Sequence, residues 1–336
     1  MAPDSHQHEA APPAAPARPF IGPSTVACPT GAFGGPEPAS KAPQTPVLGD
    51  DCWILSGPTA AGKTALSLLL ARRLDAEIVS VDSMAVYRGL DIGTAKPTPA
   101  QRAEVRHHLV DIVEPGEIYT VARWLADAAA AVESCRSRGK RVVFVGGTPL
   151  YLRALRDGLD PQPAGDPEFR RRLEAEVEAT GPAPLHARLA AVDPVAAARI
   201  HPNDARRIIR ALEVVEVTGQ PLPTSWADPR PLHPVFGRQM LVLDQPRQTL
   251  RERIDRRVEM MFADGLIEET RIAAAQPGGI GATARQAAGY AEALEVLVGK
   301  MTPEQAIQLT QQRTRQLAKR QLTWLRSFTS AIWIGA

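Results

Sequence analysis

A single glycine-rich stretch, residues 57–64, restricts most strongly what this chain can fold into. It reads GPTAAGKT and matches the G-x-x-x-x-G-K-[ST] phosphate-loop pattern. An apolar run of strand character, 52–55, comes directly before it, and an apolar-periodic helical segment, 65–74, comes directly after it. This strand–loop–helix order favours a phosphate loop over a glycine-rich loop that binds nothing. We therefore expect a di- or triphosphate to bind here.

The loop supplies both backbone donors and charge to a phosphate. Glycines at positions 57 and 62 allow the backbone N–H groups to turn inward around an anion, and the helix N-terminus adds a positive field. Lys63 brings a full charge to the outer phosphates, and the Thr64 hydroxyl is a candidate ligand for Mg²⁺. The residues expected to hold the phosphates are Gly57, Thr59, Ala60, Ala61, Gly62, Lys63 and Thr64.

Composition indicates a cytoplasmic protein with no membrane segment. A hydrophobic fraction of 44% is enough for a globular core, and no apolar run approaches the roughly 20 residues that span a bilayer. The three cysteines are scattered, which favours a reducing compartment, and the N-terminus lacks a secretory signal pattern. The paired His107 and His108 have no cysteine or carboxylate nearby at ligand spacing, so a structural role is favoured over a metal site.

The chain divides into a tail, a core and an insertion. Residues 1–50 hold 11 of the 31 prolines and no periodic apolar pattern, so we expect a disordered extension. Residues 51–160 and 236–330 combine buried-strand and helical patterns, which predicts an α/β core: a P-loop-type parallel sheet flanked by helices, with further helices towards the C-terminus. Residues 161–235 contain only helical patterns, so we expect a small all-helical insertion domain.

Two further strand ends are expected at the same edge of the sheet. The strand pattern at 77–83 brings Asp82 to the rim that carries Lys63, because ligands of parallel sheets bind beyond the carboxyl ends of the strands. Asp82 is a candidate Mg²⁺ ligand or general base, and a helix cap is the simpler alternative. The strand 142–145 ends with Gly-Gly-Thr at 146–148, where P-loop NTPases commonly carry an Asp for Mg²⁺. The two glycines admit a bulky planar group near the backbone.

The distribution of charge along the chain, and not the net charge, favours binding to the phosphates of RNA or DNA. The net charge is only +2, from 39 basic and 37 acidic residues. Residues 311–326 nevertheless contain five basic side chains and no acidic one, and the insertion carries arginines at 170–172, 206, 207 and 210. Arginines without matching acids favour a nucleic-acid backbone, although a solvated helix face remains open.

Six segments in one order point to a family. They are GPTAAGKT (57–64), VDSMAVYRGLDIGTAKP (81–97), HHLVDI (107–112), VGGTPLYL (145–152), HPNDARRIIRALEV (201–214) and TRQLAKRQLTWLR (314–326). Together they closely resemble the tRNA dimethylallyltransferases, also called tRNA isopentenyltransferases, from about residue 52 to residue 328. The resemblance implies transfer of a dimethylallyl group from dimethylallyl diphosphate to the exocyclic N6 of the adenosine 3′-adjacent to the anticodon in tRNA. The implied partners are the tRNA anticodon stem-loop and dimethylallyl diphosphate, and a monomer is expected.

The resemblance also implies a role for each matched position. The phosphate loop, with Mg²⁺ on Thr64, would hold a diphosphate leaving group in place of ATP. Asp82 matches the family's general base, and Thr148 and Arg257 match residues at the reacting centre. The positions that match tRNA-contacting segments are Asp82, Ser83, Met84, Ala85, Thr148, Arg170, Arg206, Arg207, Arg210, Gln286, Gly289, Tyr290, Lys319, Arg320, Gln321, Trp324 and Arg326.

Two departures and three alternatives stay open at this point. Many members of the family carry Gln where this chain has Ala85, and the residues around Tyr290 differ slightly from the usual pattern. The alternatives are a prenyltransferase acting on free AMP or ATP, a P-loop kinase or ATPase, and a non-catalytic RNA-binding module. The arginine-rich segments argue against the first, the Gly-Gly-Thr strand end against the second, and the phosphate loop with Asp82 against the third.

Overall fold

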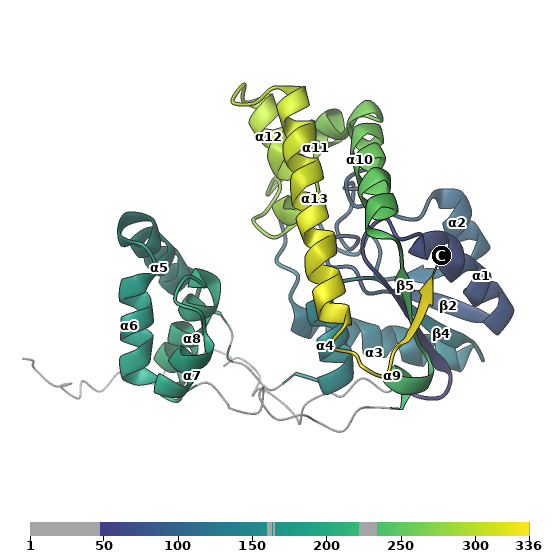
Figure 1. Ribbon diagram of the computed structural model, residues 1–336, viewed down its shortest axis with the longest axis horizontal. Coiled ribbons are helices and arrows are strands. Elements are labelled where there is room, and N and C mark those ends of the chain that lie inside the picture. The colour runs from purple at the N-terminus through teal and green to yellow at the C-terminus, as the bar shows by residue number, and fades with distance from the viewer. Residues whose placement is uncertain (1–47, 160–162, 164, 222–233, 336) are drawn as a thin grey trace, which may run out of the picture. The chain divides into compact units, whose positions relative to one another are not determined.

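A sheet of parallel strands forms the centre of the fold (Figure 1). The computed structural model describes residues 48–159, 163, 165–221 and 234–335, so the predicted tail lies outside the described residues up to position 47. The sheet order is β3-β2-β4-β1-β5-β6, with every neighbouring pair parallel. The strands are β1 (Cys52–Ser56), β2 (Ala76–Ser80), β3 (His107–His108), β4 (Arg141–Val145), β5 (Met240–Asp244) and β6 (Ile332–Gly335). The predicted α/β class with a P-loop-type parallel sheet is confirmed.

Helices cover both faces of this sheet. Leu55 and Val143 face one side and pack against α1. Ile54 and Val142 face the other side, in the cluster that takes in α3 and α4. Helices up to this point are α1 (Lys63–Leu74), α2 (Pro99–Glu104), α3 (Val121–Ser137) and α4 (Pro149–Asp157). Both faces of β1 and β4 are therefore buried, which explains why their sequences read as continuous apolar runs.

The predicted insertion is helical wherever it is described. Its helices are α5 (Pro167–Thr180), α6 (Ala183–Val192), α7 (Pro194–Arg199) and α8 (Ala205–Thr218). Three aspartates, at 166, 193 and 204, cap α5, α7 and α8 by accepting hydrogen bonds from first-turn N–H groups. Leu173, Leu189 and Ile208 belong to a hydrophobic cluster made only from these helices. The segment thus has a core of its own, while its boundaries as a domain stay a prediction.

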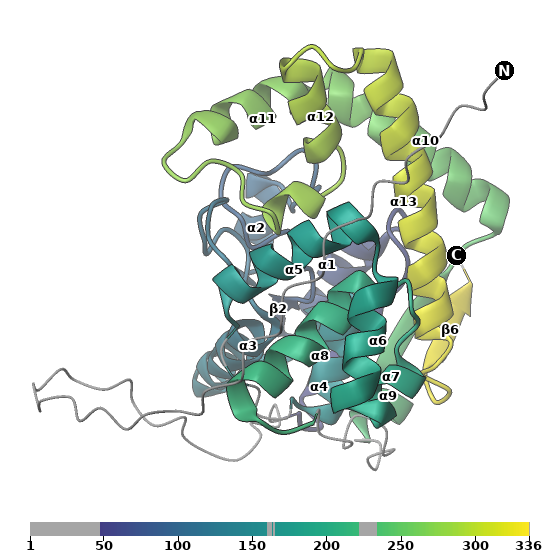
Figure 2. The same ribbon diagram turned by 90° about the vertical axis from the view of Figure 1, so that its left-hand side faces the viewer.

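The remaining helices form a group that ends in one long helix. They are α9 (Val235–Arg238), α10 (Arg247–Ala263), α11 (Leu266–Ala275), the 3₁₀ turn η2 (Ala284–Gln286), α12 (Tyr290–Leu297) and α13 (Pro303–Leu325). Figures 1 and 2 show α10 beside α13, and α12 packs on both α11 and α13. Leu325 joins the main core with Phe328, which stacks on Phe236 at 5.7 Å. The end of α13 is thereby anchored to the sheet. No described helix is long and apolar enough to cross a membrane.

Candidate active site

The phosphate loop joins β1 to α1, and glycine sets its path. Gly57 and Gly62 have φ angles of 149° and 99°, in the region that side chains disfavour. A Cβ added at Gly57 would lie 2.9 Å from the Leu243 carbonyl oxygen. Ala60 also has a positive φ, 62°, which is uncommon for a residue with a side chain. The backbone conformation therefore favours glycine at both positions of the motif, and the close approach of β5 further requires it at Gly57.

Two cations converge on this loop. The Lys63 ammonium donates to the carbonyl oxygens of Gly57 at 2.9 Å and Pro58 at 2.7 Å. Desolvation lowers the pKa of Lys63 to about 8; the charge of Arg257 adds to the lowering and that of Asp82 opposes it. Arg257 reaches the loop from α10, where its Nη1 donates to Thr59 Oγ1 at 3.5 Å. Its pKa is also lowered by desolvation. Within the described residues Arg257 has no ion-pair partner, so its charge is available to an anion.

Asp82 and Thr148 lie at the ends of the neighbouring strands β2 and β4. Thr148 Oγ1 accepts a hydrogen bond from the Ser83 backbone N–H at 3.1 Å, and the Thr148 N–H donates to the Val81 carbonyl oxygen at 3.2 Å. Asp82 Oδ1 accepts from the Met84 N–H at 2.8 Å. The predicted reacting residues are thus brought together, on backbone that two adjacent strands position.

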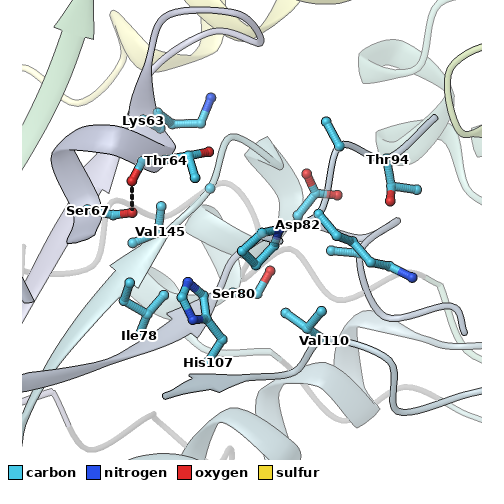
Figure 3. Close-up of a pocket in the computed structure, with 15 residues that line it drawn as sticks. Lys63, Thr64, Ser67, Ile78, Ser80, Asp82, Thr94, His107, Val110 and Val145 are labelled. Atoms are coloured by element: carbon cyan, nitrogen blue, oxygen red, sulfur yellow. Dashed lines mark hydrogen bonds between the residues drawn. The ribbon is translucent and has the colours of Figure 1, made fainter. Parts of the chain in front are cut away.

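A cavity of about 100 Å³ lies between the loop and these strand ends. Figure 3 shows Lys63 and Thr64 on one side of it and Asp82 on the other. Its lining includes the apolar side chains of Ile78, Val110 and Val145 beside the polar ones of Ser80, Thr94 and His107. The cavity therefore combines two chemistries, cationic at the loop and apolar further along β2.

Two other basic side chains line this cavity, and neither is a free cation. Burial lowers the pKa of His107, whose Nδ1 lies 2.7 Å from the Val105 carbonyl oxygen. The Lys96 ammonium is held by the Tyr87 carbonyl oxygen and by the carboxylates of Asp91 and Asp111. Lys63 and Arg257 are therefore the cations suited to an anion here, among the described residues. Sequence reasoning missed His107 as a lining residue, because no local pattern shows which face of β3 it occupies.

Gln321 of α13 connects the phosphate loop to the end of β4. Its Oε1 accepts from the Thr59 N–H at 2.8 Å, and its Nε2 donates to the Gly147 carbonyl oxygen at 2.9 Å. The side chain is buried, at 7% exposure. We expected Gln321 to contact tRNA, but both ends of its amide are already bonded inside the protein.

The Gly-Gly pair at the end of β4 serves close packing within the protein. A Cβ at Gly146 would lie 2.2 Å from the Val81 carbonyl oxygen. One at Gly147 would lie 2.7 Å from Gln321 Nε2 and 2.8 Å from the Gly57 carbonyl oxygen. The expectation that these glycines make room for a planar ligand is therefore corrected: the space is filled by backbone and by Gln321.

The other residues expected to contact tRNA differ in how far they are exposed. Tyr290 is fully buried, and its hydroxyl donates to Glu269 at 2.6 Å and accepts from the Gly93 N–H at 3.2 Å. Gly289 is buried with φ 88°, Ala85 is 6% exposed, and Gln286 is exposed on η2. Tyr290 thus offers no side chain to a ligand in this structure, whereas Ala85 lines the cavity beside Asp82 and Gln286 is open to solvent.

The insertion arginines are only partly unpaired. Arg170 makes an ion pair of 2.8 Å with Glu213, and Arg210 pairs with the same carboxylate. Glu213 is fully buried, and the two guanidinium groups hold its pKa below the usual range despite desolvation. This acid was missed at the sequence level, so the premise that these arginines lack matching acids is wrong for Arg170 and Arg210. Arg206 and Arg207 are exposed on α8, with Arg207 3.4 Å from Asp204.

The basic residues of α13 divide in a similar way. Arg313 pairs with Glu292 and Arg315 pairs with Asp255. Lys319, Arg320 and Arg326 are exposed, and the part of the chain that the structure describes offers them no ion pair. Trp324 is partly exposed between them. The last two turns of α13 therefore present positive charge and an aromatic side chain to solvent.

Comparison with known proteins gives one consistent result. A family model described as IPP transferase matches residues 85–328. The chain is 49% identical over 283 residues to a tRNA dimethylallyltransferase of Anaeromyxobacter dehalogenans, covering 84% of this chain and 94% of that protein. It is 47% identical over 283 residues to one from Geobacter metallireducens, covering 84% and 91%.

Solved structures agree with these relatives. The tRNA isopentenylpyrophosphate transferase of Bacillus halodurans is 40% identical, with a TM-score of 0.60 and coverage of 84% of this chain and 89% of that one. A eukaryotic dimethylallyltransferase captured acting on tRNA is 28% identical, with a TM-score of 0.68 and coverage of 84% and 73%.

Replacing Gln321 by Leu should remove the hydrogen bonds that fix the phosphate loop while keeping a side chain of similar volume in the same place. The change leaves the Thr59 N–H and the Gly147 carbonyl without their partner, so we expect unfolding free energy to fall by about 1–3 kcal/mol. We also expect weaker binding of inorganic diphosphate, measured by calorimetry. Gln312→Leu, on the exposed side of the same helix, is the matched control and should leave both quantities unchanged. Unaltered diphosphate binding by Gln321→Leu would mean that the bridge does not shape the loop.

Proposed function

This chain belongs to the IPP transferase family, and on that premise we propose that it transfers a dimethylallyl group from dimethylallyl diphosphate to tRNA. The proposed acceptor atom is the exocyclic N6 of the adenosine 3′-adjacent to the anticodon. The observation that carries the proposal is that Lys63 and Asp82 line one cavity, from opposite sides. A cation for a leaving diphosphate and a base for an attacking amine are the two groups that this reaction needs.

The donor fits the two chemistries of the cavity. Its diphosphate would lie on the phosphate loop between Lys63 and Arg257, and its five-carbon chain against Ile78, Val110 and Val145. The Thr64 hydroxyl lines the same cavity, and an oxygen atom of this kind is a ligand that Mg²⁺ prefers. Thr64 therefore fits a magnesium site, and the ion would neutralise part of the diphosphate charge when bound.

The proposed chemistry is one substitution at the allylic carbon. A bond forms between N6 and C1 of the donor while the bond from C1 to the diphosphate oxygen breaks, and its electron pair leaves with the diphosphate. Asp82 takes the proton from N6, and the Met84 N–H holds the Asp82 carboxylate in place by donating to it. Lys63 and Arg257 stabilise the charge that develops on the leaving group. Thr148, bonded to the Ser83 N–H, positions the backbone next to Asp82.

Recognition of tRNA is assigned to exposed basic side chains. The candidates are Lys319 and Arg320 of α13, Arg326 directly after this helix and Arg206 of α8, because these charges are exposed and have no ion pair among the described residues. The partly exposed Trp324 is suited to stacking on a base. The target adenosine would leave its stack to reach the cavity. A monomer in the cytoplasm stays the expected form and place of the enzyme.

The test of the function is transfer of labelled dimethylallyl diphosphate to unmodified tRNA, with AMP and ATP as parallel acceptors. Label in tRNA alone supports the proposal. Label in AMP or ATP would move the chain to a free-nucleotide prenyltransferase, and phosphate release from ATP would favour a kinase or ATPase. Salt-sensitive tRNA binding without any transfer would leave an RNA-binding module.

Asp82→Asn keeps the shape of the side chain and removes the base. We expect kcat for prenyl transfer to fall by about 10²–10⁴-fold, while tRNA affinity stays within a few-fold, because the change affects only proton removal. Single-turnover transfer and filter binding measure the two quantities. Asp111→Asn, at a carboxylate bound to Lys96 and Arg102 away from the loop, tests whether any nearby charge has the same effect. Normal turnover by Asp82→Asn would remove Asp82 from the mechanism.

Donor binding should weaken as pH rises above about 8. The pKa of Lys63 is lowered to about 8 in the free protein, so the ammonium that attracts the diphosphate loses its proton above this pH. We expect the affinity for dimethylallyl diphosphate to fall by up to about tenfold per pH unit in that range. In Lys63→Arg the guanidinium stays charged, so its affinity should be insensitive to pH over the same range. Equal pH profiles for the two proteins would contradict the assignment.

The exposed charges of α13 should set the salt dependence of tRNA binding. Replacing Lys319, Arg320 and Arg326 by Ala should weaken binding and reduce the slope of log K against log salt by about 1 for each tRNA phosphate that no longer has a basic side chain beside it. The control is Arg72→Ala, since Arg72 is already paired with Glu104 at 2.6 Å. An unchanged slope in the triple variant would place the tRNA elsewhere.

A further inference from the structure

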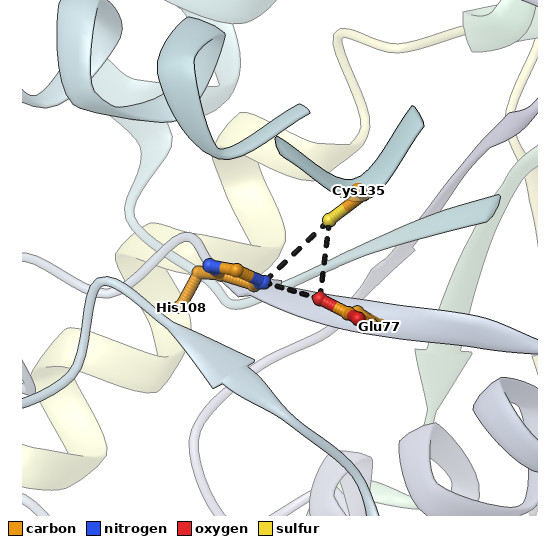
Figure 4. Close-up of side chains that lie close together, drawn as sticks. All are labelled: Glu77, His108 and Cys135. Carbon is orange, nitrogen blue, oxygen red and sulfur yellow. Dashed lines mark hydrogen bonds and ion pairs between the residues drawn. The ribbon is translucent and has the colours of Figure 1, made fainter. Parts of the chain in front are cut away.

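A buried cluster outside the catalytic cavity brings together a carboxylate, an imidazole and a thiol. Glu77 comes from β2, His108 from β3 and Cys135 from α3 (Figure 4). Cys135 is fully buried and Glu77 is 8% exposed. They are the one group of this composition found among the described residues. Neither the phosphate loop nor Asp82 contacts this cluster, so the proposed reaction does not explain it.

The sheet itself creates the cluster. Val79 of β2 is opposite His108 of β3 in a parallel register, and alternate residues of a strand share a face, so Glu77 lies on the face of His108. Helix α3 covers that face and adds Cys135. His107 lies on the opposite face, where it lines the catalytic cavity. The expectation that the histidine pair has no cysteine or carboxylate nearby is therefore wrong for His108.

The distances approach those of a tetrahedral metal site. Cys135 Sγ lies 3.5 Å from both Glu77 Oε2 and His108 Nε2, and these last two atoms are 2.6 Å apart. Ordinary zinc bond lengths and tetrahedral angles require ligand separations of about 3.6 Å to sulfur and about 3.4 Å between nitrogen and oxygen. The two distances from Cys135 Sγ already agree with these values, and the distance between Glu77 Oε2 and His108 Nε2 has to increase by about 0.8 Å.

We propose that Glu77, His108 and Cys135 bind one thiophilic divalent cation of the zinc class, with water as the fourth ligand. Thiolate and imidazole ligands select such ions over Mg²⁺ and Ca²⁺. The site joins β2, β3 and α3, so the cation fastens the two-residue edge strand that also carries His107. Its role is structural, and it is separate from the magnesium proposed at Thr64.

Arg138 is the group that competes with the cation. Its guanidinium donates to both oxygens of Glu77, at 3.0 and 2.7 Å, and its side chain is 34% exposed. These bonds hold the pKa of Glu77 at about 2, so the carboxylate is ionised and needs no proton removed to bind a metal. Burial raises the pKa of Cys135 to about 12, and binding therefore releases the thiol proton to solvent. Since Arg138 is the exposed member of the network, its rotation also provides an entry route.

The test is titration of the metal-free full-length protein with Co²⁺, followed by displacement with Zn²⁺. We expect one equivalent of Co²⁺ with a thiolate-to-metal charge-transfer band and tetrahedral visible bands, both abolished by Zn²⁺. Cys135→Ser and His108→Ala should weaken binding by at least about 100-fold. Arg138→Gln should tighten it by about two- to five-fold, because it removes the ion pair that competes for the Glu77 carboxylate.

The other thiols provide matched controls. Cys52 is buried, and its bonded side-chain neighbours are Asp51 and Arg136 and not a histidine. Cys52→Ser should therefore keep the full cobalt spectrum. Cys28→Ser should do the same. Absence of a thiolate band in the wild-type protein would overturn the proposal whether or not the variants fold. Retention of the full band in Cys135→Ser would also overturn it, and so would loss of the band in either control.

Discussion

The site depends on one buried amide that holds two loops in register. Gln321 bonds the Thr59 N–H of the phosphate loop and the Gly147 carbonyl oxygen at the end of β4. Its presence explains why β4 ends in glycine, because a side chain at 147 would collide with the amide and with the Gly57 carbonyl. P-loop NTPases commonly carry a carboxylate at the corresponding strand end. In this chain the end of β4 is instead packed against backbone and Gln321. The space left beside the loop is bounded by β2, and Asp82 is the carboxylate that faces it.

Basic residues in this chain do two different jobs, and their partners separate them. Arg170 and Arg210 neutralise the buried Glu213, and Arg138 neutralises Glu77, so each of these partly exposed side chains serves a buried carboxylate. Removing one of these would leave a buried carboxylate unpaired, which costs stability before it affects any ligand. Lys319, Arg320 and Arg326 have exposed side chains and no such partner in the described part of the chain. A count of arginines therefore overstates the surface that is available to RNA.

Sequence patterns predicted the fold class and the edge of the sheet at which the cavity between Lys63 and Asp82 lies. The phosphate-loop motif and the apolar runs of β1 and β4 are local signals, and strand ends of a parallel sheet share an edge, so Asp82 and Lys63 could be placed together in advance. Long-range partners could not be found in this way. Gln321 is 262 residues from Thr59, and Glu213 is 43 residues from Arg170. Nothing local distinguishes a glutamine that holds a loop from one that faces RNA. His107 and His108 lie on opposite faces of the sheet because β3 is a strand, and a pattern of only two residues does not predict a strand.

The distance along the chain between the phosphate loop and its glutamine has a consequence for synthesis. A ribosome extends a chain at about 5–20 residues per second, so the loop is made well before α13 exists. Until residue 321 has emerged, the Thr59 N–H has no partner and β4 ends beside an unfilled space. The part-made chain therefore carries the motif before the bonds that fix the loop to the end of β4 can form. Under the proposed function, the donor site and the basic end of α13 would be completed in the same late step of folding.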